Sequence, residues 1–252
     1  MSSVVSAQQW ESLLTSLNLE DNGVHVLERK TGVSFPSALG PSLKLLGIGL
    51  CKQDLGFKKV DAYAFGVYAA DEDIKECLSE KYGKISASEL PGNEEFTDDF
   101  MDSDIPMAVK IQYVYGGLSI GSVRDEFEES VGSRLHKLAR GSDENNELLQ
   151  RFISQFKSEF KILCGTGILF LREKEHVLRT FSNDEYGCAY SLFMICTGYF
   201  EKLALGSDID AQDAGSIQSK LLCKSILDLY VGEEAIDEQA KDEIENNVAT
   251  YL

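Results

Sequence analysis

KLLGIGLCKQDLGFKKVDAYAFGVY occupies residues 44–68 and contains two apolar runs, Leu45–Leu50 and Val60–Tyr68, on either side of a short polar loop. The second run is rich in Val, Tyr, Phe and Ala, and its length is typical of a mostly buried strand. Glycines recur where a strand packs against another backbone or turns sharply, at positions 47, 49, 56 and 66. The stretch therefore predicts a β-hairpin in the middle of a core.

The sequence on the C-terminal side of this hairpin predicts an alternation of strands and helices in blocks. Residues 71–82 and 119–137 have helical patterns, and residues 107–115 alternate apolar and polar side chains as a half-buried strand does. Residues 147–160 predict a further helix, residues 167–178 a strand pair, and the sequence from residue 215 onward is predicted to be helical. Because the two strand groups lie far apart in sequence, the expected class is α+β.

Length and charge limit the functions that the chain can have. A chain of 252 residues predicts one sizeable core, and a net charge of −18 argues against nucleic acid and anionic membrane surfaces as partners. No apolar run reaches the roughly 18 residues that a membrane span needs. The six cysteines form no CxxC pair and the three histidines lie far apart, so we expect reduced thiols and no metal or other cofactor.

Three blocks of the sequence resemble one known family. GIGLC at residues 47–51, followed by VDAYAFGVY at residues 60–68, resembles the start of the chalcone isomerase fold. The stretches 115–135 and 219–234 are similar to the plant fatty-acid-binding branch of that family, and the blocks occur in the family's order. The resemblance covers about residues 32–180 and 215–248.

The resemblance implies a chalcone isomerase-like open-faced β-sandwich, in which a large antiparallel sheet is covered on one face by a layer of helices. We expect an N-terminal helical extension over residues 1–30, with its helix at residues 7–17, and a chalcone isomerase-like domain over residues 31–252. Residues 181–214 are an atypical insert in that domain, and a loop of this length is unusual in a compact domain. The insert is interpreted as a product of alternative splicing or, alternatively, as a lid helix.

The residues that the resemblance assigns to catalysis are absent from this chain. Isomerases of the family resemble one another in an Arg at the end of the glycine turn, where Cys51 stands here. Ser119 and Ser122 stand in place of a Tyr and a Lys, and residues 229–230 replace a Thr–Met pair. A neutral thiol cannot replace the charge and donors of a guanidinium, so the residues favour a non-catalytic protein. If active, the chain would be of the chalcone isomerase, or intramolecular lyase, type.

In the fatty-acid-binding branch, the same Arg and a Tyr on the following strand hold a carboxylate, and the resemblance places Cys51 and Tyr63 at these positions. Lys52 is the neighbouring positive charge, although adjacent strand residues normally point to opposite faces. Apolar residues of the strands are available to line a cleft. The expected lining comprises Leu50, Phe65, Ile111 and Tyr113, with Leu46, Ile48 and Val109 as further candidates.

The expected function is therefore non-catalytic binding of a long-chain fatty acid, linked to fatty-acid metabolism. The alternatives are a chalcone–flavanone isomerase and a non-catalytic helper of flavonoid biosynthesis. We expect a monomer whose partner is a long-chain fatty acid. The resemblance implies the chloroplast stroma. The start MSSVVSAQQWESLL has no Arg and an early acid, which is untypical of a transit peptide and leaves the cytoplasm as the alternative.

Overall fold

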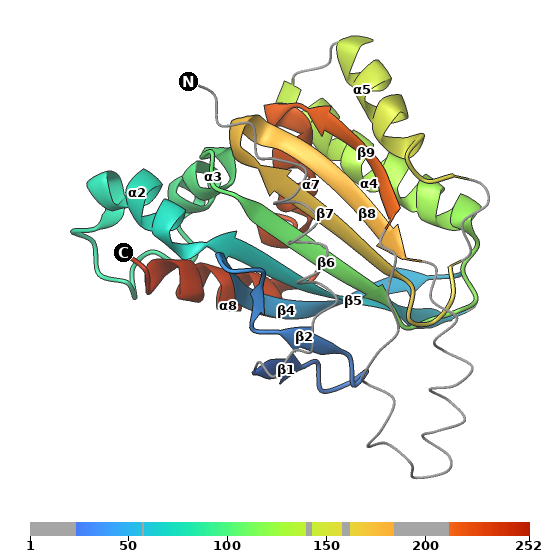
Figure 1. Ribbon diagram of the computed structural model, residues 1–252, viewed down its shortest axis with the longest axis horizontal. Helices are drawn as coiled ribbons and strands as arrows, with labels where there is room; N and C mark the ends of the chain where they lie inside the picture. Colours follow the sequence, from blue (N-terminus) through green and yellow to red (C-terminus); the bar gives the residue numbers. More distant parts are fainter. Residues whose placement is uncertain (1–23, 57, 140–142, 158–161, 184–211) are drawn as a thin grey trace.

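The computed structural model of the protein describes residues 24–56, 58–139, 143–157, 162–183 and 212–252 (Figure 1). Its centre is a seven-stranded antiparallel sheet in which each strand pairs with the next one along the chain. The strands, in order across the sheet, are β3 (Ala38–Leu39), β4 (Leu43–Asp54), β5 (Lys59–Ala70), β6 (Met107–Tyr113), β7 (Gly167–Glu173), β8 (Val177–Asn183) and β9 (Gln212–Gln218).

Helices cover one face of the sheet, as Figure 1 shows for α4, α7 and α8. The long connections between strands supply most of them, and the short η1 turn (Lys174–His176) joins β7 to β8. The helices are α2 (Asp71–Tyr82), α3 (Glu94–Asp102), α4 (Ile120–Ala139), α5 (Asp143–Ile153), α7 (Lys220–Val231) and α8 (Glu238–Ala249). The main hydrophobic core lies between these helices and the sheet. The predicted class, a large antiparallel sheet with a helical layer, is confirmed.

The opposite face of the sheet carries a smaller apolar cluster. A two-stranded sheet of β1 (His25–Leu27) and β2 (Ser34–Pro36) lies on this side. Phe35 of β2 is fully buried in a cluster with Leu50 and Ala64, which are partners across the β4–β5 ladder. The sheet therefore buries side chains on both faces near β4 and β5, and the two faces have different neighbours.

The β4–β5 hairpin is the predicted one, and glycine allows its close packing. Gly49 faces Phe65 across the ladder. A Cβ at Gly49 would clash with Cζ of Phe65 and would lie 2.6 Å from Cβ of Ala240 on α8. The missing side chain thus allows the Phe65 ring to lie across β4 while α8 packs against the same strand.

Side chains of α8 satisfy the free side of β4. Beyond Lys44, β4 has no neighbouring strand on the side of β3 within the described residues. There the Asp237 carboxylate accepts the Leu50 N–H at 3.0 Å, and the Asn247 amide donates to the Leu46 carbonyl at 2.6 Å. Asp237 also accepts the Ala240 N–H as the N-cap of α8, so one side chain fixes both the start of the helix and its position on the strand.

The predicted secondary structure and domain boundaries need correction in the following places. Residues 215–218 belong to strand β9 and not to a helix, because they pair with β8 through Thr180, Arg179, Leu178 and Val177. The predicted helical extension over residues 1–30 contains a strand, β1, which pairs with β2; its helix at residues 7–17 lies outside the described residues. The ends of the predicted insert, residues 181–183 and 212–214, are strand residues of β8 and β9, and residues 184–211 lie outside the described part of the chain.

The cysteines are not all reduced. Cys51, Cys77 and Cys223 are free thiols, whereas Cys164 is disulfide-bonded. The expectation of reduced thiols is therefore wrong at Cys164.

Candidate functional site

Five of the six predicted site residues lie together on the face of the sheet that is covered by helices. Cys51 of β4 faces Tyr63 of β5, which faces Tyr113 of β6, so that their side chains form a row across three neighbouring strands. The Tyr63 and Tyr113 rings meet edge to face at 5.4 Å between centroids. Phe65 and Ile111, two residues along from Tyr63 and Tyr113, continue the same face toward the middle of the sheet.

The assignment of Leu50 to this site needs correction. Leu50 packs with Phe35 and Ala64 on the opposite face of the sheet. The reason is the alternation of side chains along a strand, which places Leu50 and Cys51 on opposite sides. Lys52 is exposed, so it does not supply a positive charge beside Cys51.

Two helices add polar groups that face this row of strand residues. Glu126 lies on α4 between the buried residues Val123 and Phe127. The Cys51 thiol donates a weak hydrogen bond of 3.8 Å to Oε1 of Glu126. Tyr230 of α7 is fully buried, and its ring lies 4.8 Å from that of Phe65 between centroids. We use the term polar cluster for the five residues Cys51, Tyr63, Tyr113, Glu126 and Tyr230.

The polar cluster has unused hydrogen-bonding capacity. The Tyr113 hydroxyl and Oε2 of Glu126 are buried and have no hydrogen-bond partner among the described residues, and the buried Tyr230 hydroxyl lies beside that of Tyr63. Leaving a buried polar group unpaired typically costs about 1–3 kcal/mol. Two such atoms in one place are therefore an expensive arrangement for a purely structural core, and they indicate a place where a polar group is received.

Burial favours the uncharged forms of the titratable side chains in the polar cluster. Burial raises the pKa of the Cys51 thiol to about 12, and the nearby Glu126 carboxylate adds to the increase. Burial also raises the pKa of Tyr63 and Tyr113 well above the ordinary value, and it raises the pKa of Glu126. At neutral pH the thiol and the phenols are thus uncharged hydrogen-bonding groups.

The positions at which the isomerases have a Tyr and a Lys hold a pair of serines in this chain. Ser119 and Ser122 lie at the start of α4, where their hydroxyl oxygens are 2.8 Å apart and Ser119 Oγ also accepts the Ser122 N–H. Ser119 is exposed, and the pair acts as a local helix cap. These hydroxyls are partners of each other and carry no charge.

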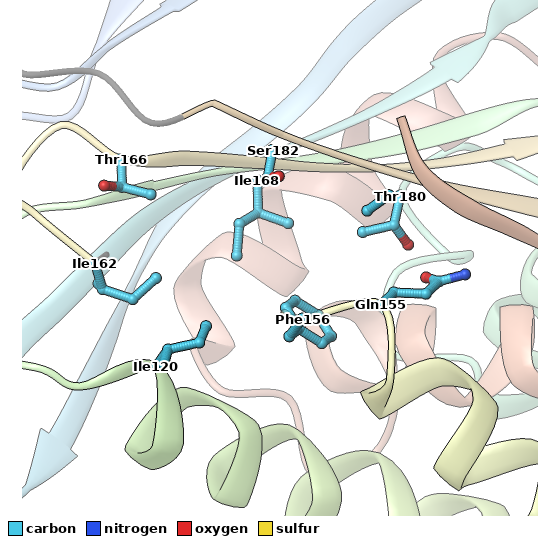
Figure 2. Close-up of a pocket in the computed structure, with 9 residues that line it drawn as sticks. Ile120, Gln155, Phe156, Ile162, Thr166, Ile168, Thr180 and Ser182 are labelled. Atoms are coloured by element: carbon cyan, nitrogen blue, oxygen red, sulfur yellow. The ribbon is translucent and has the colours of Figure 1, made fainter. Parts of the chain in front are cut away.

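A small pocket with a cavity volume of about 10 Å³ lies near the start of α4, between this helix, the α5 end and strands β7 and β8 (Figure 2). Buried polar atoms of Gln155, Thr180 and Ser182 have no hydrogen-bond partner in the described part of the chain. Figure 2 shows Thr180 and Ser182 projecting from β8 toward the side where Gln155 and Phe156 lie. The apolar wall of the pocket consists of Ile120, Phe156, Ile162 and Ile168.

The polar cluster and the pocket lie at two points along the same helix. Glu126 and Ile120 are six residues apart on α4, which corresponds to about 9 Å along a helix axis. Between them lies Val123, which is fully buried against the core. The inner face of α4 therefore leads from the polar cluster, past the packed core at Val123, to the pocket at Ile120.

The sequence analysis missed Glu126 and recorded Tyr230 only as part of an apolar helix face. Glu126 was not found because the α4 pattern was used for its apolar stripe, and a Glu beside that stripe is normally solvated. One available signal was that Glu126 lies three residues after Val123 and one before Phe127, both of which are buried. A carboxylate at that edge of the stripe lies at the boundary of the core.

The described residues contain no candidate metal site and no candidate membrane span. Within them, no three His, Cys, Asp or Glu side chains lie close enough together to hold a metal ion. No helix in the same ranges is both long and apolar enough to cross a membrane.

An antiparallel sheet with helices on one face, and polar side chains between the two layers, is the architecture of the chalcone isomerase fold. The model of the family described as chalcone isomerase like matches residues 41–245. The chain belongs to the chalcone isomerase-like family.

Three known proteins show how similar the chain is to members of this family. It is 42% identical to fatty-acid-binding protein 1 of Arabidopsis thaliana over 236 residues, which cover 93% of this chain and 74% of that protein. A crystal structure of an Arabidopsis thaliana fatty-acid-binding protein, 42% identical, superposes with a TM-score of 0.75 over 90% of this chain and 98% of that one. Chalcone isomerase-like protein 1 of Humulus lupulus is 29% identical over 187 residues, 74% of this chain and 86% of that protein.

Proposed function

We propose that this protein binds a long-chain fatty acid between its sheet and its helices and does not catalyse a reaction on it. The head group occupies the polar cluster, and the acyl chain follows the inner face of α4 toward the pocket at Ile120. The observation that carries the proposal is the pair of buried polar atoms, the Tyr113 hydroxyl and Glu126 Oε2, that have no hydrogen-bond partner among the described residues. The similarity to an Arabidopsis protein named for fatty-acid binding supports it.

The same cluster argues against isomerisation of a chalcone. Such a reaction develops a phenolate, which needs a preorganised positive charge or several strong donors. At Cys51 the chain has a neutral thiol beside the Glu126 carboxyl group, and an acid at this place opposes a developing negative charge. Incubation with a chalcone should therefore give no turnover above the spontaneous rate.

A helper role in flavonoid biosynthesis is the second candidate function. It differs from the first in that the protein would bind no fatty acid. Mass spectrometry of lipids that co-purify with the protein should find a fatty acid of about 12–18 carbons. Displacement of a fluorescent fatty acid should then give a saturable affinity. Purified protein that carries no lipid and displaces no probe would overturn fatty-acid binding.

The position of the acyl chain can be tested at Ile120. Ile120→Trp should fill the pocket and weaken binding of a C18 acid more than that of a C12 acid, since the longer chain reaches further along α4. Ile120→Leu, which keeps the side-chain volume, is the matched control and should leave the chain-length preference unchanged. Equal effects of the Trp variant on both acids would place the chain elsewhere.

We also propose that the protein acts as a monomer in the chloroplast stroma, in fatty-acid metabolism. The similarity to the fatty-acid-binding branch supports this location, and the cytoplasm is the alternative. Import of a tagged full-length chain into isolated chloroplasts, and sedimentation of the purified protein, test the two statements. Exclusion from the organelle or sedimentation as a dimer would contradict them.

A further inference from the structure

We infer that Glu126 makes the polar cluster selective for long-chain ligands whose head group donates a hydrogen bond, so that a fatty acid binds here as the neutral acid and not as the carboxylate. This inference rests on the proposed function and assigns the chemistry of its head-group site. Glu126 is the specificity-determining residue, and the Tyr113 and Tyr230 hydroxyls donate hydrogen bonds to the same head group.

The first argument is the hydrogen-bonding state of the Glu126 carboxyl group. Its Oε1 receives only a thiol at 3.8 Å, which is a weak donor, and its Oε2 is buried with no partner within the described ranges. An ionised carboxylate accepts hydrogen bonds and donates none. The group that completes this site is therefore a donor.

The second argument is the charge around Glu126. The titratable side chains that face it are Cys51 from β4, Tyr63 from β5, Tyr113 from β6 and Tyr230 from α7, all of them neutral at physiological pH. From α5, Phe152 packs against Phe127, and Gln150 donates a hydrogen bond to Glu128. In the described part of the protein, the cluster thus contains an acid and no base.

One cation of the same helix is already engaged. Arg134 lies two helical turns further along α4, where its Nε is 3.0 Å from Asp228 Oδ2. Its remaining nitrogens donate to the carbonyl oxygens of Glu234 at 2.7 Å and Ser130 at 3.2 Å. A ligand carboxylate beside Glu126 would therefore meet a like charge that no neighbour offsets, and two close carboxyl groups in a buried site ionise together only at a high cost.

The geometry supplies a complete set of partners for a neutral acid. The hydroxyl of the ligand acid donates its proton in a hydrogen bond to Glu126 Oε2. The carbonyl oxygen of the ligand then accepts from the Tyr113 hydroxyl, which has no other partner within the described ranges, and from the Tyr230 hydroxyl. No covalent bond changes. Above the ordinary carboxyl pKa range, binding takes up one proton from solution.

The experiment compares three C12 probes on the full-length protein by displacement of a fluorescent lipid at pH 6, 7 and 8. For dodecanoic acid, Kd should fall by up to about tenfold for each unit of decrease in pH, because one proton is bound with the ligand. For 1-dodecanol, which donates without ionising, Kd should change less than about threefold. Methyl dodecanoate, which only accepts, should bind about tenfold more weakly than the alcohol, as expected for a lost charge-assisted hydrogen bond.

Two variants separate Glu126 from general effects of pH. Glu126→Gln should remove the pH dependence of dodecanoic acid binding and strengthen that binding at pH 8 by about tenfold, because the like charge is gone. Glu129→Gln, an exposed acid on the same helix, is the control and should keep the pH dependence of the unmodified protein. Circular dichroism confirms that both variants are folded.

The outcomes distinguish a failure of this inference from a failure of the proposed function. Dodecanoic acid that binds as tightly at pH 8 as at pH 6, or a Glu126→Gln protein that keeps the pH dependence, overturns the inference while fatty-acid binding stands. Absence of binding for all three probes at every pH overturns the proposed function and the inference together. The inference is supported if the Kd of dodecanoic acid depends on pH, the Kd of 1-dodecanol does not, and methyl dodecanoate binds weakly.

Discussion

Two glutamates of this protein reach into its core, and their surroundings differ in every respect. Glu245 of α8 is 3% exposed, and its two carboxylate oxygens accept the Gly92 N–H and the Thr97 hydroxyl, each at 2.7 Å. Glu126 of α4 has one oxygen near a thiol and one with no partner among the described residues. Both are acids on helices that pack against the same sheet.

The difference shows how a buried charge can be classified. Glu245 joins α8 to the start of α3, and its hydrogen bonds are complete, so its role ends within the fold. Glu126 retains an acceptor that the fold does not use, and a protein gains nothing in stability from such an atom. Glu245 is fully buried and Glu126 is partly exposed, but it is the count of hydrogen-bond partners that separates a structural acid from a binding one.

The largest expected effect is on Glu245. Glu245→Ala should lower the free energy of unfolding by about 3 kcal/mol, because two donors to a charged acceptor lose their partner in a buried place. Urea unfolding at pH 7 measures it, with Glu243→Ala, an exposed acid of the same helix, as the control. If Glu126→Ala destabilised the protein as much as Glu245→Ala, the contrast between the two residues would be lost.

The next effect concerns the cation that the family resemblance expects at Cys51. Cys51→Arg combined with Glu126→Gln should strengthen dodecanoic acid binding at pH 8 by about tenfold or more, since an Arg–carboxylate pair is charge-assisted and can be bidentate. Cys51→Arg alone should gain less, because the new guanidinium lies within reach of Glu126 and is neutralised by it. Displacement titrations of both variants measure this. Equal gains would mean that the guanidinium does not meet Glu126.

A smaller effect is expected at Tyr63, which stands between Cys51 and Tyr113 in the row. Tyr63→Phe should weaken fatty-acid binding by roughly 0.5–1.5 kcal/mol through the loss of one hydroxyl. Tyr251→Phe, at the C-terminal end of the chain, serves as the control. Unchanged affinity in the Tyr63 variant, in protein of normal stability, would remove Tyr63 from the head-group site.

The smallest effect is a dependence of stability on pH. Burial raises the pKa of Glu126 in the folded state, so the folded protein holds this proton more tightly than the unfolded chain does. The contribution of Glu126 to the free energy of unfolding therefore falls as pH rises from its ordinary carboxyl value through the raised one. Glu126→Gln should be more stable than the unmodified protein at pH 8 and should lose this advantage at pH 4. The opposite sign would show that the carboxylate is stabilised as the anion.

The sequence predicted the hairpin, the helices around it and most of one face of the site. Alternation along a strand is a local rule, so Tyr63 with Phe65 and Ile111 with Tyr113 were correctly grouped, and the same rule excludes Leu50 beside Cys51. Strand β9 was beyond reach because residues 215–218 have no apolar pattern, and only their pairing with β8 makes them a strand. The role of Glu126 could not be predicted for a related reason. Its lack of hydrogen-bond partners depends on three strands and a second helix that are far from it in sequence.

The contact of α8 with β4 has a consequence for how copies of this protein meet one another. An unpaired side of a strand offers N–H and C=O groups in a row, and a second chain can add to it as another strand. On β4 the Leu50 N–H and the Leu46 carbonyl are occupied by Asp237 and Asn247. The C-terminal helix thus protects the sheet against edge-to-edge aggregation, and loss of this helix would expose a template for self-association on the very strand that carries Cys51.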